Sequence, residues 1–289
     1  MNFQTRSLTG LALFGTVVIA GCTDGYDADR EAAKALGELN VLDESGLTEL
    51  MLDVADPNEA ANYFRKGLIE NPERVDFKRG LGSSLLRARR AEEAVAIYKD
   101  MDEKGEAEPL DRLKYAEALI HVSEWQAAKA QLDKIPPTVE NFDRYRLEAM
   151  IADYQQQWDK ADSFYDTARG LTTRPAVIYN NWGISKLSRG DTKGAEDKFR
   201  QAVAHDPDFF SAKNNMAISR AKRGDYQLPV VPMTEVERAQ LLHNIALQAI
   251  RNGDIDIARG LLEEAIDTHP QHFAEAADKL AALETNVGR

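Results

Sequence analysis

The sequence repeats itself at an interval of 34 residues, counted from residue 179 to residue 213. Residues 179–191 read YNNWGISKLSRGD, residues 213–225 read KNNMAISRAKRGD, and seven of the thirteen positions are identical. Periods of 20 to 50 residues are typical of solenoids, in which each repeat is one supersecondary unit. A single unit cannot bury its apolar face alone, so the period requires a stack of units.

Small residues recur at two places in each period. With Ala176 as position 1, the predicted units begin near Val41, Val75, Pro109, Phe142, Ala176, Phe210 and Ala239. Position 8 is then Thr48, Gly82, Ala116, Ala149, Gly183, Ala217 and Ala246, and position 20 is Ala60, Ala94, Ala128, Ala161, Ala195, Pro229 and Ala258. This pattern resembles the tetratricopeptide repeat, in which two antiparallel helices pack closely at positions 8 and 20. The resemblance implies an all-α, right-handed superhelix of about six to seven helix-turn-helix repeats.

The period also predicts where the stack is interrupted and where it ends. In the unit from Phe210, two prolines three residues apart (Pro229 and Pro232) forbid a continuous second helix. We therefore expect a solenoid over residues 41–272, with a link at 227–233 in place of one helix. Residues 273–289 are expected to form a capping helix and tail that cover the open end.

The first residues resemble the export signal of a bacterial lipoprotein. A run from Leu8 to Ala20 is almost wholly apolar, too short to span a bilayer, and followed by Gly21 and Cys22, the only cysteine. We interpret residues 1–21 as a signal peptide, Cys22 as the lipidated residue and residues 22–40 as an acidic tether. The alternative is an ordinary secretory signal, with Cys22 incidental. Because Thr23, not aspartate, follows the cysteine, the pattern favours the periplasmic face of the outer membrane over the inner membrane.

Composition and motifs argue against several function classes. The net charge of −12 is opposite to that of a surface that binds phosphates, so we expect no nucleic-acid partner. The chain contains no GxxxxGK[ST] loop, no HExxH and no GxSxG, and His269 and His272 have no third ligand nearby in sequence. We therefore expect no metal, no cofactor and no enzymatic activity.

An asparagine register on the first helix of the last three predicted units is the candidate binding site. Position 6 is Asn181, Asn215 and Asn244, and position 5 is Asn180, Asn214 and His243. A side-chain amide can donate to a peptide carbonyl and accept from a peptide N–H, so the strip could hold an extended chain. The alternative is that these residues only reflect shared ancestry of the repeats. The link at Pro229–Pro232 is a second candidate surface, unless it folds back into the gap left by the missing helix.

Two C-terminal segments extend the resemblance to a narrower family. Residues 226–234 (YQLPVVPMT), followed by 237–243 (ERAQLLH), and residues 268–273 (THPQHF) are similar to the TadD lipoproteins of the tight-adherence (Tad/Flp) pilus assembly system. This resemblance implies a pilotin-like scaffold in the outer membrane that assists the pilus secretin or other pilus assembly proteins. A general envelope lipoprotein that recruits peptidoglycan synthases or proteases is the rival interpretation. The sequence leaves the oligomeric state open.

Overall fold

The computed structural model describes residues 46–287. The chain divides into two units, Met1–Asp56 and Pro57–Arg289. In the first unit the described residues include a helix over 46–53. The predicted signal peptide, Cys22, the tether and the predicted start of the first repeat near Val41 all lie outside the described residues.

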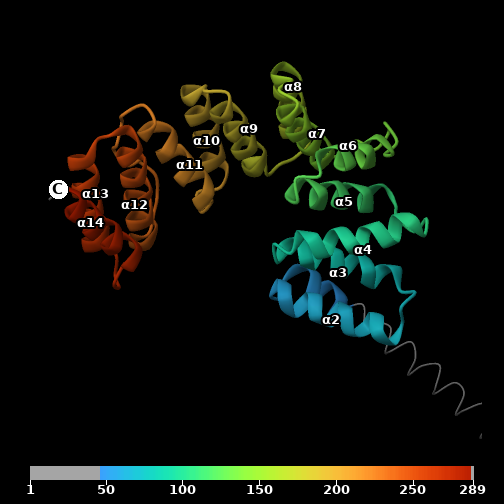
Figure 1. Cartoon of the computed structure of the whole chain (residues 1–289). Helices are drawn as coiled ribbons and strands as arrows, with labels where there is room; N and C mark the ends of the chain where they lie inside the picture. The colour runs from blue at the N-terminus through green and yellow to red at the C-terminus, as the bar shows by residue number, and fades with distance from the viewer. Residues whose placement is uncertain (1–45, 288–289) are drawn as a thin grey trace, which may run out of the picture. The chain divides into compact units, whose positions relative to one another are not determined.

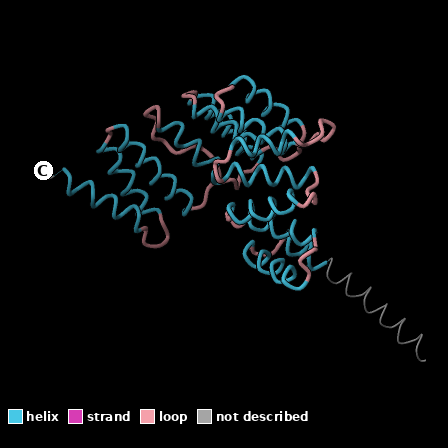
Figure 2. The backbone as a smooth tube through the Cα atoms, turned by 45° about the vertical axis from the view of Figure 1, so that its right-hand side comes forward, coloured by secondary structure: helices cyan, strands magenta, loops and turns pink. Residues whose placement is uncertain are grey.

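The second unit is a succession of helices joined by short loops. Residues 46–287 contain no strand (Figure 2), which confirms the all-α fold. The helices are α2 (Pro57–Glu70), α3 (Val75–Arg87), α4 (Ala91–Glu103), α5 (Pro109–His121), α6 (Trp125–Asp133), α7 (Phe142–Tyr154), α8 (Trp158–Gly170), α9 (Ala176–Ser188), α10 (Thr192–His205), α11 (Phe210–Ala221), α12 (Glu235–Asn252), α13 (Ile255–Thr268) and α14 (Ala274–Val287). Helices α3, α5, α7, α9 and α11 begin at the residues that the 34-residue period predicts.

The helices pack as a stack of hairpins in chain order, from α2 to α14 (Figure 1). Each helix contacts the next one, and the first helices of successive repeats also contact each other, from α3 through α5, α7 and α9 to α11. Helix α11 contacts α12, the first helix of the last repeat. We call α3, α5, α7, α9, α11 and α12 the first-helix layer.

Close helix crossings within each hairpin explain the small residues. The alanines at position 20, namely Ala60, Ala94, Ala128, Ala161, Ala195 and Ala258, are all fully buried, and Pro229 is buried as well. At position 8, a Cβ on Gly82 would lie 2.6 Å from the Tyr98 ring, and one on Gly183 would lie 2.5 Å from the Phe199 ring. The glycines therefore make room for aromatic rings of the second helix, which sequence reasoning had not anticipated.

The turn after each first helix uses one left-handed residue. Glycine adopts this conformation without steric cost, and Gly190, Gly224 and Gly253 have φ of 85°, 81° and 90°. The equivalent positions in the earlier repeats are also left-handed, although they hold Arg89, Ser123 and Gln156 with φ of 60°, 64° and 58°. A left-handed conformation costs a side-chain-bearing residue roughly 1–2 kcal/mol. The fold thus imposes the conformation whatever residue is present.

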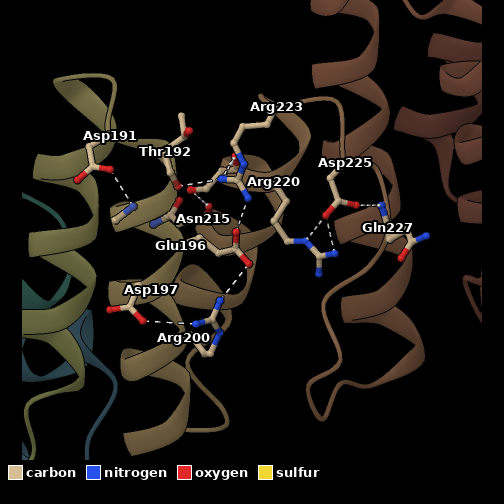
Figure 3. Close-up of polar contacts among 12 residues, drawn as sticks. Asp191, Thr192, Glu196, Asp197, Arg200, Asn215, Arg220, Arg223, Asp225 and Gln227 are labelled. Atoms are coloured by element: carbon tan, nitrogen blue, oxygen red, sulfur yellow. Dashed lines mark hydrogen bonds and ion pairs between the residues drawn. The ribbon is translucent and has the colours of Figure 1, made fainter.

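The chain between α11 and α12 is non-helical and folds back onto its neighbours. Leu228 packs against the apolar clusters on both sides of α12, and Val231 packs against the core around Phe199, whereas Val230 is fully exposed. Polar contacts hold the start of this link (Figure 3): Asp225 accepts hydrogen bonds from Arg220 and from the Gln227 backbone N–H. The link therefore packs against the repeats on both sides through Leu228 and Val231.

The last repeat begins earlier than the period predicts. Helix α12 starts at Glu235, not near Ala239, because Thr234 and Glu237 form a reciprocal capping box there. Beyond α13, Phe273 and Ala276 are buried against this repeat, with Leu280 and Leu283 partly buried beside them. Helix α14 thus covers the apolar surface that α12 and α13 leave uncovered.

Candidate functional site

The asparagine strip lies on the first-helix layer, and most of its side chains form hydrogen bonds between adjacent repeats. The Asn215 side-chain amide donates to Asn180 Oδ1 at 3.1 Å, and the Asn244 amide donates to Asn214 Oδ1 at 2.8 Å. Position 6 of one repeat therefore bonds position 5 of the repeat before it. Asn181 differs, because its amide faces the thioether of Met150 at 3.5 Å, a weak acceptor.

His243 is the end of this strip and is partly covered. Its ring lies 5.4 Å from the Phe273 ring, in an edge-to-face arrangement. Burial lowers the pKa of His243 below its usual value. Its imidazole therefore favours the neutral form, and it closes the strip where the capping segment begins.

The amides keep hydrogen-bonding capacity beyond the bonds between repeats. Each carries two N–H donors and an oxygen with two lone pairs, and each bond between repeats uses one donor and one lone pair. Asn180 is 6% exposed, whereas its partner Asn215 is more accessible. The strip therefore has one clear structural role, joining repeats, and binding of a peptide backbone by the accessible amides stays a prediction.

A cavity of about 600 Å³ lies beside Asn181, and sequence reasoning missed it. It is lined by Trp125, Met150, Asp153, Tyr154, Gln156, Trp158, Tyr165, Asn181, Ile184, Ser185 and Ser188. Most of these residues come from α7 and α9, with a tryptophan from the start of α6 and another from the start of α8. Both tryptophans occupy position 17 of their repeats, so the shared register is a signal that the sequence did contain.

Three of the four aromatic side chains that line the cavity are accessible, and only Tyr165 is buried. Trp125 and Tyr154 stack with their ring centroids 4.7 Å apart and an interplanar angle of 9°. Tyr154 is 50% exposed, and Trp158 is half-buried. Exposed aromatic rings beside a concave surface are typical of places where a partner's side chain docks.

One carboxylate, Asp153, lies in this cavity. Ser185 Oγ donates to its Oδ1 at 2.6 Å, and the Tyr165 hydroxyl donates to its Oδ2 at 2.9 Å. Burial raises the pKa of Asp153 above its usual range, although these two hydrogen bonds oppose the change. The residues that line the cavity include no lysine, arginine or histidine.

A second cavity, of about 270 Å³, lies nearer the N-terminus and is charged. It is lined by Arg79, Ser83, Tyr98, Leu110, Asp111, Leu113, Lys114, Glu117, Asn141, Asp143 and Leu147. Its charges pair with one another: Arg79 Nε lies 2.9 Å from Asp111, and Lys114 Nζ lies 2.9 Å from Glu117. The charged side chains of this cavity are therefore already paired within the fold.

Neither metal-ligand clusters nor membrane-spanning helices occur in the part of the chain that the structure describes. No group of three or more histidine, cysteine, aspartate or glutamate side chains is placed to hold an ion there. None of the helices within residues 46–287 is long and apolar enough to cross a bilayer. The lipidation site predicted at Cys22 lies outside these residues.

Solved structures with the same fold are distant in sequence. A chain of the APC/C hetero-tetramer Cut9–Hcn1 aligns with 82% of this chain at a TM-score of 0.57 and 13% identity. The human IFIT1 dimer with m7Gppp-AAAA aligns with 78% at a TM-score of 0.58 and 14% identity. This chain spans only 48% and 58% of those two proteins. A tetratricopeptide repeat protein from Parabacteroides merdae aligns with 83% at a TM-score of 0.52 and 12% identity, over 96% of its own length.

Sequence comparison identifies the repeat itself. No curated protein matches the chain significantly. Residues 51–109 match the model of the tetratricopeptide repeat family. This match covers residues 51–109, and the helix pairs with buried position-20 alanines continue the same architecture beyond it, so the fold is a solenoid of the tetratricopeptide type.

Proposed function

We propose that this protein is a lipid-anchored envelope scaffold that binds an extended polypeptide along its first-helix layer. The observation that carries the proposal is the aromatic cavity beside Asn181, which places exposed rings next to a strip of side-chain amides. Rings offer apolar contact area for side chains, and amides can bond a peptide backbone. Tetratricopeptide solenoids present extended concave surfaces of this kind to their partners.

The narrower proposal is a pilotin-like role for the secretin of a Tad/Flp pilus. It is supported by the resemblance of residues 226–234, 237–243 and 268–273 to the TadD lipoproteins, together with the lipoprotein signal expected at residues 1–22. In the first segment Leu228, Pro229 and Val231 are packed into the solenoid. These residues therefore serve the fold, and the partner's contacts are proposed on the first-helix layer.

The anchor is tested separately from the partner. We expect the wild-type protein to incorporate labelled palmitate and to fractionate with outer-membrane vesicles on a density gradient. The Cys22→Ala variant is expected to lose the label and to appear in the soluble periplasmic fraction. If the variant keeps both the label and the membrane fraction, the lipid anchor at Cys22 is wrong.

The partner is tested by affinity purification of the full-length protein from detergent-solubilised envelopes of the source bacterium. Recovery of the pilus secretin supports the pilotin-like role. Recovery of peptidoglycan synthases or proteases without the secretin would instead support the rival interpretation. A bait with Asn181, Asn215 and Asn244 all changed to alanine tests the amide strip, provided that its thermal melt shows an intact fold.

A further inference from the structure

The aromatic cavity between α7 and α9 contains a negative charge and no positive one. Asp153 is its only acidic residue, and its lining includes no basic side chain. Within the described residues, Asp153 forms no ion pair, and its hydrogen bonds come from the neutral hydroxyl groups of Ser185 and Tyr165. A carboxylate removed from water without a counter-charge is unfavourable, so the cavity is electrostatically suited to a cation.

The basic residues near this cavity are paired with another carboxylate, although the Arg189 guanidinium also lies 5.7 Å from the centroid of the Trp158 ring. Arg189 lies 2.5 Å from Asp162, and Lys186 lies 3.5 Å from the same side chain. In the preceding repeat the half-buried carboxylate Glu117 pairs with the buried Arg146 of α7 at 2.7 Å. Asp153 thus differs from Glu117 in having no ion-pair partner among the described residues, although Arg146 lies on the same helix, α7.

Aromatic rings make the cavity a better site for a cation than the carboxylate alone would. Trp125, Tyr154 and Trp158 line it with accessible rings, whereas Tyr165 is buried and contributes the hydroxyl group that donates to Asp153. The faces of tryptophan and tyrosine rings attract ammonium and guanidinium groups, most strongly when water is excluded. The same protein already uses this contact elsewhere, since Lys198 Nζ lies 3.5 Å from the centroid of the Trp182 ring.

We propose that this cavity receives a lysine or arginine side chain of the bound partner segment. Asp153 supplies the counter-charge, the aromatic rings enclose the cation, and Asn181 lies in the same lining to bond the adjacent peptide group. The inference rests on the proposed function, because it specifies the chemistry of the partner that the first-helix layer binds. The net charge of −12 adds a long-range attraction for a basic segment.

The test uses the full-length protein labelled with 5-fluorotryptophan, whose three tryptophans give three assignable fluorine signals. The probes are N-acetyl-arginine amide, N-acetyl-lysine amide and N-acetyl-leucine amide. We expect the two cationic probes to shift the Trp125 and Trp158 signals saturably. Trp182, which is 7% exposed and donates to Asp162, is the internal reference and should not move.

Two variants with the same change in charge separate the cavity from general electrostatics. Asp153→Asn is expected to weaken binding of the arginine probe about tenfold, or ~1.4 kcal/mol, while leaving the leucine probe unaffected. Asp159→Asn is the matched control, because Asp159 is exposed, follows Trp158 directly and does not line the cavity. It should leave the affinity for both probes unchanged.

Other results would overturn the inference. The first is that the leucine probe binds as tightly as the arginine probe. The second is that Asp153→Asn leaves the affinity for the arginine probe unchanged. The third is that no probe shifts the tryptophan fluorine signals. If Asp153→Asn fails to fold, the Tyr154→Leu variant tests the inference instead. It keeps the Asp153 carboxylate and removes the tyrosine ring that stacks on Trp125. That variant should weaken the arginine probe several-fold, and unchanged affinity would count against the inference.

Affinity purification distinguishes this inference from the proposed function. If the secretin is recovered equally with wild-type and Asp153→Asn baits, the proposed function stands and the cation site is wrong. If the cationic probes bind through Asp153 but no secretin is recovered, the site stands and the pilus role is wrong.

Discussion

The earlier first helices, α3, α5 and α7, are joined to one another by charges, whereas α9, α11 and α12 are joined mainly by neutral amides. Arg79 of α3 pairs with Asp111 of α5, and Arg146 of α7 pairs with Glu117 of α5. In the later repeats Asn215 bonds Asn180, and Asn244 bonds Asn214. One ion pair does occur there, between the buried Lys213 of α11 and Glu237 of α12.

The comparison shows that repeat stacking fixes helix positions but not the chemistry of the contacts. Buried ion pairs are costly to break, because removal of one partner leaves an unpaired charge in a poorly hydrated site. Neutral amide bonds are weaker and do not titrate. We therefore expect the two regions to differ in mutational sensitivity and in response to acid.

The largest effect is expected from the Arg146–Glu117 pair. Glu117→Leu leaves a buried guanidinium with Asp143 as its remaining ion-pair partner, and we expect it to lower the free energy of unfolding by about 3–5 kcal/mol. Urea unfolding followed by circular dichroism measures the change. The double variant Glu117→Leu with Arg146→Met should recover most of the loss. A loss below about 1 kcal/mol would mean that the pair behaves like an exposed one.

Acid should destabilise the charged region first. Burial would raise the pKa of Glu117, but the charges of Arg146 and Lys114 outweigh it and lower the pKa to about 2, below its ordinary value of 4.5. This contribution, about 3 kcal/mol, is present above pH 4.5 and is lost as the pH falls toward 2. Thermal melts between pH 7 and pH 2.5 should show a smaller loss for Glu117→Gln than for the wild type. Equal losses for the two proteins would contradict the assignment.

The amide region predicts smaller, pH-independent effects. Asn215→Ala and Asn244→Ala each remove one hydrogen bond between repeats, and we expect each to cost about 1 kcal/mol at any pH from 4 to 8. Asn181→Ala is the matched control, because its amide only approaches a thioether and alanine favours the helix by roughly 0.5 kcal/mol. If all three variants change the free energy of unfolding equally, the hydrogen bonds between repeats do not stabilise the fold.

The smallest effects are expected at the left-handed turn residues. Ser123→Gly relieves a positive φ at an exposed site but adds freedom to the unfolded chain, so we expect a net gain of about 0.5 kcal/mol. Gly253→Ala, at φ of 90°, should instead cost about 1 kcal/mol. Chemical denaturation of both variants checks the opposite signs. A loss on Ser123→Gly would show that the serine is not strained.

The fold was largely predictable from the sequence because the constraint that sets it is periodic. Small residues at two fixed positions of the repeat predicted the first residue of five helices correctly, from Val75 of α3 to Phe210 of α11. The start of α12 was mispredicted by four residues because Thr234 and Glu237 set it locally through their capping box, independently of the period.

The site was less predictable because it depends on contacts between repeats. The sequence placed the asparagines in one register, but it could not show that position 6 of one repeat bonds position 5 of the repeat before it. The cavity combines Trp125 with Asp153 and Ser185, which come from three different repeats. Such a combination depends on the rotation between units, and no single repeat encodes that rotation.

The non-helical link between α11 and α12 bears on how the protein unfolds. Repeat arrays behave as chains of units coupled to their nearest neighbours, so each interface sets how far a local opening spreads. Here Tyr226 and Leu228 pack both against the cluster shared by α11 and α12 and against the cluster of α12, α13 and α14. A few side chains thus replace a full helix at this interface. The C-terminal three helices are therefore expected to form their own cooperative folding block.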